Sequence, residues 1–402
     1  MQMKQSAIYR PVLLAMSLLI HHSSVANTNT EHIHSKPTPI ETTQALPNLN
    51  VTGYSLVNLS SNTLLAQYNA DEKMPPASLT KLMTLFIVYD YLDKGLIRSD
   101  EPVYISRKAW RSEGSRMFVE PDSEVNVGQL IRGVSIVSGN DASVALAEHI
   151  SGTEEKFVEL MNQKAKALGL NNTHFANSTG LPHKDHFSSP QDMNMIGTEL
   201  IKQHPQVLTH TKEKTMTYNK ITQDNRNKLL WKDASIFGLK TGHTKEAGYC
   251  LVAAAERDNQ IMIATLFGAR SEQQRDAVMT KLFNHAQHRF KNITIKQDNK
   301  IPELRVWYGD QSYLQPKLKA PIQLSIPNNQ QGMIRTRYQT ISTIKAPIKA
   351  DQVIGEYTVY INDVATIKTP LVAGKSVSKQ PLWLQPFEWI TFQANQIMKI
   401  LS

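Results

Sequence analysis

Three short apolar segments in the second half of the chain constrain its fold most. They are Phe237 to Thr241, Tyr249 to Ala255 and Ile261 to Gly268, and they are separated by glycine or by Asp258-Asn259. Apolar runs of this length between turn residues predict adjacent antiparallel strands. The chain must therefore supply helices or further strands that cover the faces of this sheet.

An earlier segment, Gly53 to Tyr68, has the pattern of a β-hairpin around Ser60, Ser61 and Asn62. Between this hairpin and the later strands, apolar residues recur at helical spacing and several stretches carry start or stop signals. The expected helices run from the prolines at 75–76 to Gly95, over 127–137, from Ala142, from Thr153 to Gly169, from Ser189 and from Ser271 to Phe290. This order predicts an α+β domain over residues 50–290, in which the hairpin and the late strands share one sheet.

The helical patterns stop near residue 291. Short apolar segments between turns then predict a small all-β domain over residues 291–378. The last stretch, residues 379–402, places Phe387, Ile390 and Ala394 on one helical face, with Trp383 and Trp389 nearby. An aromatic amphipathic helix of this kind suits a membrane interface, and docking against the protein itself is the alternative.

The first residues have the features of a secretory signal peptide, residues 1–26. Lys4 and Arg10 precede an apolar run, and Ser24-Val25-Ala26 has the small residues of a cleavage site. The apolar run, residues 12–20, is too short for a helix that spans about 30 Å of hydrocarbon. We therefore expect export, followed by a flexible polar leader over residues 27–49.

The formal net charge is +9, and loss of residues 1–26 removes two basic residues and no acidic one, which leaves +7. A basic chain suits membrane headgroups or an acidic wall polymer. The charge is spread without the basic and aromatic stretches of nucleic-acid-binding proteins, so we expect no nucleic-acid partner. Cys250 is the only cysteine, so the chain has no internal disulfide, and its apolar surroundings predict a buried thiol.

Two groups of residues raise the question of a metal site. The first is Glu31, His32 and His34 in the polar leader, and the second is His183, Asp185 and His186. The second group makes a metallo-carboxypeptidase the competing enzyme class. A His-Glu-x-x-His pair is missing and both groups lie outside helices, so we expect neither a metal nor a cofactor.

Ser78 and Lys81 are three residues apart at the start of a predicted buried helix, after Pro75-Pro76. At this spacing the two side chains share one helix face, and the first turn leaves backbone N–H groups without a helical acceptor. A serine needs a base to become a nucleophile, and a lysine serves only as a free amine. Burial and the like charge of Lys240 both act to lower the pKa of Lys81.

Two further motifs follow in the chain. Ser138-Gly139-Asn140 forms a corner between two predicted helices. A purely structural explanation is that Gly139 ends the first helix and Asn140 caps the second. Lys240-Thr241-Gly242 ends a predicted strand, where a lysine points either to solvent or into a cleft. The order Ser-x-x-Lys, Ser-x-Asn, Lys-Thr-Gly matches the motif set of β-lactamases and penicillin-binding proteins.

The chain resembles the low-molecular-mass (class C) penicillin-binding proteins that act as serine-type D-alanyl-D-alanine carboxypeptidases. The likeness extends beyond the three motifs and covers essentially the whole chain. It includes Arg116-Met117-Phe118, Asn140-Asp141-Ala142, Leu168-Gly169-Leu170, Ser178-Thr179-Gly180-Leu181, Asn225-Arg226-Asn227 and Lys240 to Tyr249. Two positions depart from the expected pattern: Gly139 replaces the aspartate of the general motif, and Cys250 stands where asparagine is expected.

The resemblance implies a transpeptidase-like domain with helices clustered on an antiparallel sheet, followed by a small β domain and a membrane-anchoring helix. It implies a periplasmic enzyme on the outer face of the inner membrane, with peptidoglycan pentapeptide stems as substrate and β-lactams as covalent inhibitors. Ser78 is then the nucleophile, Lys81 the general base and Ser138 a proton relay.

The remaining site residues take binding roles in this scheme. Asn140 fixes Lys81 and the substrate amide, whereas Lys240 and Thr241 of the Lys-Thr-Gly242 motif meet the substrate carboxylate. Arg226 assists them by analogy with the family. The backbone N–H groups of Ser78 and His243 form the oxyanion hole.

Other activities remain open for the same site. A D,D-endopeptidase cuts beside the same D-alanine, and a non-catalytic wall-binding protein would retain the fold. Class A β-lactamases use a glutamate to activate the deacylating water, and Phe175 to Pro182, where it is expected, contains no acidic residue. We therefore expect slow deacylation of penicillin and at most weak β-lactamase activity.

Overall fold

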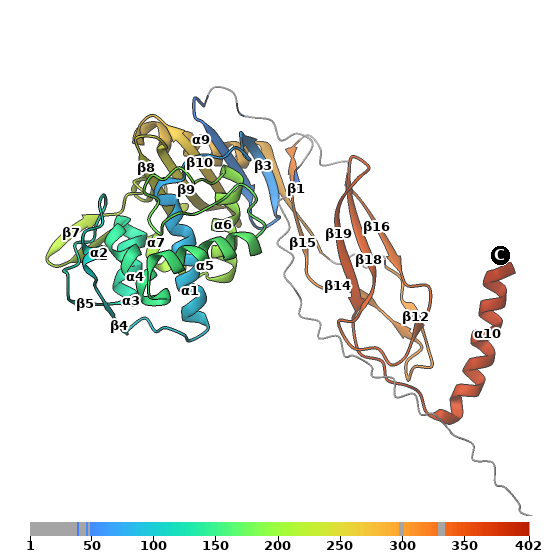
Figure 1. Cartoon of the computed structure of the whole chain (residues 1–402). Coiled ribbons are helices and arrows are strands. Elements are labelled where there is room, and N and C mark those ends of the chain that lie inside the picture. The colour runs from blue at the N-terminus through green and yellow to red at the C-terminus, as the bar shows by residue number, and fades with distance from the viewer. Residues whose placement is uncertain (1–37, 40–45, 47–48, 297–300, 329–333, 402) are drawn as a thin grey trace, which may run out of the picture. The chain divides into compact units, whose positions relative to one another are not determined.

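The computed structural model describes residues 38–39, 46, 49–296, 301–328 and 334–401 (Figure 1). The predicted signal peptide and the cluster of Glu31, His32 and His34 lie outside these residues.

A six-stranded sheet forms the centre of the first domain, with the strand order β1-β3-β2-β10-β9-β8. Its strands are β1 (Thr38–Pro39), β2 (Gly53–Asn58), β3 (Thr63–Tyr68), β8 (Ile236–Thr244), β9 (Gly248–Arg257) and β10 (Gln260–Ala269). β2 and β10 pair in antiparallel fashion, with Leu56 opposite Ala264. The expectation that the hairpin and the late strands share a sheet is confirmed. The stretch expected to be a flexible leader contributes β1, which lies parallel to β3.

Helices cover both faces of this sheet (Figure 1). On one face, Phe86 of α1 and Phe157 of α5 belong to a core that includes Ile263 of β10. On the other face, Phe283 of α9 packs with Leu251 and its neighbours. The longer helices are α1 (Lys81–Asp93), α4 (Asn140–Ser151), α5 (Glu154–Ala167), α6 (Pro190–Gln203) and α9 (Glu272–Arg289).

Shorter elements connect these helices and line one side of the domain. They are η1 (Ala77–Thr80), α2 (Arg107–Trp110), α3 (Val127–Arg132), η2 (Gly133–Val137), α7 (Val207–Thr211), α8 (Leu229–Lys232), β4 (Pro102–Tyr104), β5 (Glu124–Asn126), β6 (Thr215–Tyr218) and β7 (Ile221–Asp224). Three of the predicted helix starts are capped by hydroxyl groups, since Thr153, Ser189 and Ser271 each accept a bond from a backbone N–H three residues later.

The stretch expected to be one helix over 127–137 is two elements. α3 ends at Arg132, and η2 is a π-helical turn that closes at Ser138. Ser138, rather than Gly139, adopts the left-handed conformation, with φ 62°. The wider turn and the left-handed residue redirect the chain before α4 begins at Asn140.

The all-β domain at the C-terminal end has its own apolar core. Its strands are β11 (Phe290–Ile295), β12 (Leu304–Trp307), β13 (Tyr313–Leu314), β14 (Pro316–Leu318), β15 (Ile322–Pro327), β16 (Ile334–Thr340), β17 (Ile344–Lys345), β18 (Val353–Ile361) and β19 (Val364–Ala373). A four-stranded sheet with the order β14-β19-β18-β16 is its largest unit. Tyr357 and Leu371 are buried between it and the β11–β15 pair.

The chain then continues into η4 (Leu382–Leu384) and α10 (Gln385–Leu401). Phe392 of α10 contacts Trp307, with 5.0 Å between ring centroids, and Glu388 pairs with Arg305 at 3.1 Å. Trp383 and Phe387, in contrast, are largely exposed. One side of the helix thus contacts the β domain, and an apolar side is left uncovered. Among the described helices, none is long and apolar enough to cross a membrane.

A loop from α5 toward α6 approaches η1 closely at Gly180. A Cβ at this position would lie 1.8 Å from the carbonyl oxygen of Ala77, and the φ of Gly180 is +87°. Both facts exclude a side chain here, because a left-handed φ strains other residues and the space is already filled.

We predict that Gly180→Ala lowers the free energy of unfolding by at least about 2 kcal/mol, from the steric clash added to left-handed strain. Gly152→Ala is the matched control, since Gly152 has φ +77° and nothing within 4 Å of a Cβ; it should lose only about 1 kcal/mol. Urea unfolding of both variants measures the difference. Equal losses would show that the contact with Ala77 carries no cost.

Candidate active site

Ser78 lies in η1, one turn before α1, and Lys81 is the first residue of that helix. The Lys81 amine is 3.1 Å from the Ser78 hydroxyl. It also donates to the Asn140 side-chain oxygen and to the Thr179 carbonyl oxygen, each at 2.6 Å. The preceding residue, Ala77, has φ +47°, a strained conformation for a residue with a Cβ.

Lys81 is completely buried, with 0% of its surface exposed. Burial lowers its pKa to about 7, and the opposing charge of Asp141 acts to raise it. A substantial fraction of the amine is therefore unprotonated near neutral pH and can accept a proton. We expected the like charge of Lys240 as a second cause. Burial is the main cause, and the repulsion between the two buried amines appears in the lowered pKa of Lys240.

Ser138 and Asn140 enter the site from the corner between η2 and α4. Asn140 accepts a bond from Lys81 through its side-chain oxygen and donates through its amide nitrogen to the Glu113 carbonyl. Its side chain is thereby fixed in one orientation. The Ser138 hydroxyl is buried and has no hydrogen-bond partner within the described part of the chain. A buried hydroxyl without a partner in a polar site is suited to bind a substrate or relay a proton.

Asp141 follows directly and explains the glycine of the middle motif. Its carboxylate accepts bonds from the backbone N–H groups of Met117, Phe118 and Val119 at 3.0, 2.9 and 3.3 Å. A Cβ at Gly139 would lie 2.8 Å from this carboxylate. The carboxylate thus occupies the space that a side chain at position 139 would need.

The third motif lies on β8, an edge strand of the sheet. Lys240 and Thr241 are buried, and the Lys240 amine donates to the Thr241 carbonyl at 2.9 Å. β8 continues to Thr244, so the motif lies within the strand rather than at its end. Gly242 faces η1, where a Cβ would lie 3.2 Å from the Ser78 nitrogen. The strand therefore passes directly beside the serine.

The pKa of Lys240 lies well below its usual value, first because of burial and then because of the positive charges of Lys81 and Arg226. Arg226 itself is exposed and donates to Gln223 at 3.4 Å. An anion that entered beside Lys240 would favour its protonated form. His243 is exposed, and its ring lies 4.1 Å from that of Tyr249.

The candidate zinc ligands have other partners. Both ring nitrogens of His186 are hydrogen-bonded, one to the Thr80 hydroxyl at 2.8 Å and the other to the Ala176 N–H at 3.2 Å. His183 is exposed and lies 3.9 Å from Asp185. The described residues contain no group of three or more side chains placed to bind a metal ion. His186 instead ties η1 to the loop that follows α5.

Sequence motifs identified most of these side chains but missed several that hold them. The Thr179 carbonyl, the Glu113 carbonyl and the amides of Met117 to Val119 are backbone groups, which no residue type marks in a sequence. Asp141 and Gly180 were visible only through the family resemblance. Glu154 of α5 accepts a hydrogen bond from Ser178 in the loop, and the sequence indicated only that Glu154 lies in the first turn of a helix.

Comparison with known proteins identifies relatives of this chain. The chain matches the D-alanyl-D-alanine carboxypeptidase family, Peptidase_S11, over residues 40–271, and the penicillin-binding protein 5 C-terminal domain family over residues 290–379. It is 35% identical to D-alanyl-D-alanine carboxypeptidase DacC of Escherichia coli K12, an alignment that covers 89% of this chain and 91% of that protein.

Solved structures show the same fold. Penicillin-binding protein 5 of Haemophilus influenzae superposes with a TM-score of 0.75 at 35% identity, over 83% of this chain and 99% of that one. Penicillin-binding protein D2 of Listeria monocytogenes, in an ampicillin-bound form, gives a TM-score of 0.54 at 30% identity, over 58% of this chain and 96% of that one. The chain therefore belongs to the Peptidase_S11 family of D-alanyl-D-alanine carboxypeptidases.

Proposed function

We propose that this protein is a serine-type D-alanyl-D-alanine carboxypeptidase that removes the terminal D-alanine from peptidoglycan pentapeptide stems. The observation that carries the proposal is the fully buried Lys81 amine, 3.1 Å from the Ser78 hydroxyl, with a pKa lowered to about 7. A neutral amine in contact with a serine hydroxyl is the minimum that nucleophilic catalysis by serine requires.

In the first step the Ser78 oxygen attacks the carbonyl carbon of the penultimate D-alanine, and its proton moves to the Lys81 nitrogen. The C–N bond then breaks, and the leaving amine of the last D-alanine takes up a proton through the Ser138 hydroxyl. The product is an ester on Ser78, which water hydrolyses to regenerate the hydroxyl and release the shortened stem. Asn140 holds Lys81 in place throughout.

Binding groups on β8 orient the substrate for this attack. Lys240 and Thr241 hold the terminal carboxylate, and Arg226 adds positive charge at the same end. The substrate carboxylate favours the protonated form of Lys240 and so opposes the burial that lowers its pKa. The backbone N–H groups of Ser78 and His243 stabilise the oxyanion, a contribution of about 3–4 kcal/mol per donor. Gly242 permits the close approach of the two elements that supply these donors.

β-Lactams acylate the same serine in this scheme, because their strained amide occupies the place of the scissile bond. The loop beside Lys81, residues 175–182, contains no acidic side chain. The carboxylate of Glu154, which contacts this loop, accepts two bonds from Ser178. We therefore infer that the penicilloyl ester on Ser78 persists and that the protein acts as a weak β-lactamase at most.

We further propose that the enzyme acts in the periplasm, attached to the outer face of the inner membrane through η4 and α10. Five large apolar side chains of this segment are 56–82% exposed: Leu382, Trp383, Phe387, Trp389 and Ile390. Aromatic side chains of this kind favour the interface of a bilayer. The contacts of Phe392 and Glu388 with the β domain orient the helix and leave this apolar side free.

The activity is tested with a pentapeptide that ends in D-Ala-D-Ala. The wild-type protein should release one D-alanine per peptide and become labelled by fluorescent penicillin, whereas Ser78→Ala should lose both by at least about 10³-fold. Ser55→Ala, which removes a buried hydroxyl on β2 that bonds Gln191 and none of the site residues, is the control. Labelling without release of D-alanine would reject the carboxypeptidase and favour a penicillin-sensing protein.

The rate of acylation should depend on pH through Lys81. Because only the free amine accepts the proton of Ser78, the second-order rate of penicillin labelling should rise tenfold per pH unit below about 7 and level off above it. Labelling rates between pH 5 and 9 give this profile, and Lys245→Ala, which removes an exposed lysine, should leave it unchanged. A rate that still rises tenfold per unit up to pH 9 would contradict the lowered pKa of Lys81, and a rate independent of pH would mean that Lys81 is not the base.

Membrane attachment is tested by sedimentation with phosphatidylglycerol-containing vesicles. The full chain should pellet with the vesicles, and the double variant Trp383→Ser, Trp389→Ser should partition at least tenfold less, because two large aromatic side chains leave the interface. Gln393→Ser, on the same helix, is the control and should bind as the wild type does. Equal binding by the double variant and the control would assign these side chains to another role.

A further inference from the structure

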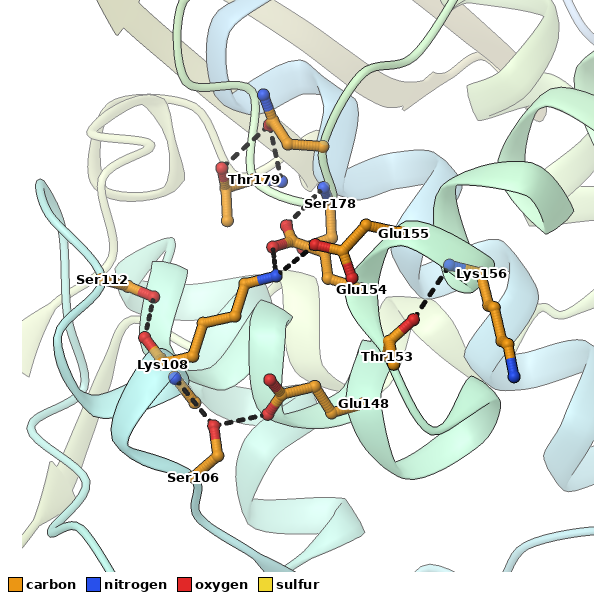
Figure 2. Close-up of polar contacts among 12 residues, drawn as sticks. Ser106, Lys108, Ser112, Glu148, Thr153, Glu154, Glu155, Lys156, Ser178 and Thr179 are labelled. Carbon is orange, nitrogen blue, oxygen red and sulfur yellow. Dashed lines mark hydrogen bonds and ion pairs between the residues drawn. The ribbon is translucent and has the colours of Figure 1, made fainter.

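Glu154 lies at the start of α5 and reaches the loop that flanks Lys81 (Figure 2). We propose that Glu154 is a positioning residue for the acylation reaction, which holds the Ser178-Thr179 segment so that the Thr179 carbonyl keeps Lys81 aligned with Ser78. The inference builds on the proposed role of Lys81 as the base. It assigns a function to a side chain that contacts neither Ser78 nor Lys81.

The contact between Glu154 and the loop is direct and shielded. One carboxylate oxygen accepts from the Ser178 N–H at 3.0 Å and from the Ser178 hydroxyl at 2.8 Å. Only 12% of the Glu154 side chain is exposed, and Ser178 is completely buried. Hydrogen bonds to a shielded carboxylate are stronger than those between neutral groups.

The next residues carry this contact to the base. The Ser178 carbonyl accepts a bond from the Thr84 hydroxyl of α1 at 2.7 Å, and the Thr179 carbonyl accepts from Lys81 of the same helix at 2.6 Å. Glu154 therefore holds one side of a two-residue segment whose other side is bound to the helix that begins with Lys81. A shift at Ser178 is transmitted to Thr179 through a single peptide unit.

Internal bonds keep the loop stiff, so that an anchor at one residue controls its neighbours. The side-chain oxygen of Asn177 accepts from the N–H and the hydroxyl of Thr179 and from the N–H of Gly180. Gly180 then lies against Ala77, the residue before the nucleophile. Within this loop, Asn177 maintains the shape and Glu154 fixes its position against α5.

The second carboxylate oxygen of Glu154 extends the same support. It lies 3.1 Å from the Lys108 amine on α2. A short segment after α2 leads to Glu113, whose carbonyl accepts from the Asn140 amide. Glu154 thus contacts the loop that provides the Thr179 carbonyl and, through Lys108, the helix that precedes Glu113, whose carbonyl orients Asn140.

Glu155 offers a matched comparison in the next position. Its carboxylate also contacts Lys108, at 2.7 Å, but its side chain is 73% exposed. Figure 2 shows its carboxylate joined to Lys108, whereas Ser178 is joined to Glu154. A substitution at 155 therefore changes charge and the Lys108 pair in the same place without touching the loop.

The experiment compares Glu154→Ala, Glu154→Gln and Glu155→Ala in the full-length protein by fluorescent penicillin labelling between pH 5 and 9. Glu154→Ala should lower the second-order acylation rate roughly tenfold, equivalent to about 1.4 kcal/mol. The midpoint of its pH profile should rise above that of the wild type, since a displaced loop admits water to an amine whose pKa is lowered by burial. Glu154→Gln retains an acceptor for Ser178 and should restore most of the rate, and Glu155→Ala should match the wild type.

The results separate positioning from simple stabilisation. A Glu154→Ala protein that unfolds earlier but keeps the wild-type rate and midpoint would overturn the proposal, as would a loss of equal size in Glu155→Ala. If Glu154→Ala does not fold, Ser178→Ala removes one of the two bonds and should give a smaller loss with the same direction of midpoint shift. A wild-type profile without any inflection near pH 7 would count against Lys81 as the base, and so identifies failure of the proposed function separately.

Discussion

The exclusion of water from the Lys81 amine is the constraint on which the rest of the site depends. A lysine in solvent is protonated and cannot accept a proton, so the role proposed for Lys81 requires burial without a carboxylate in contact with the amine. The chain does this with two neutral acceptors, the Asn140 oxygen and the Thr179 carbonyl. These come from segments 59 and 98 residues away in the sequence. The helix cluster, the corner at Ser138 and the loop before α6 all serve to bring these acceptors to one amine.

Much of the fold follows from local patterns. Apolar runs between turns predicted β8, β9 and β10, and hydroxyl residues at positions 153, 189 and 271 predicted three helix starts that the structure confirms. These features depend on residues close in sequence, for which side-chain type and spacing are enough. The shared sheet of the hairpin and the late strands followed from the order of the elements.

Other features required the folded chain. The π-helical turn at Gly133–Val137 has the same apolar spacing as an α-helix, so the sequence predicted one continuous helix. The Thr179 and Glu113 carbonyls are present at every residue of any protein, and only tertiary contact selects them. The extent to which Lys81 is buried, which is the main cause of its low pKa, likewise depends on segments far away in the sequence. Sequence motifs therefore do not predict which side chains become buried by distant segments or which backbone carbonyls accept their hydrogen bonds.

The π-helical turn before Ser138 also sets the direction in which the following side chains point around the helix axis. An α-helix advances about 100° per residue, so one residue more or less in a turn moves each following side chain by more than a quarter of a revolution around the axis. The turn therefore determines that the Ser138 hydroxyl and the Asn140 amide enter the site together, while Asp141 faces the backbone of Met117 to Val119. The number of residues in η2, rather than their identity, therefore sets the orientation of Ser138 and Asn140 relative to Lys81. A deletion there would leave every motif residue in the sequence and separate them in space.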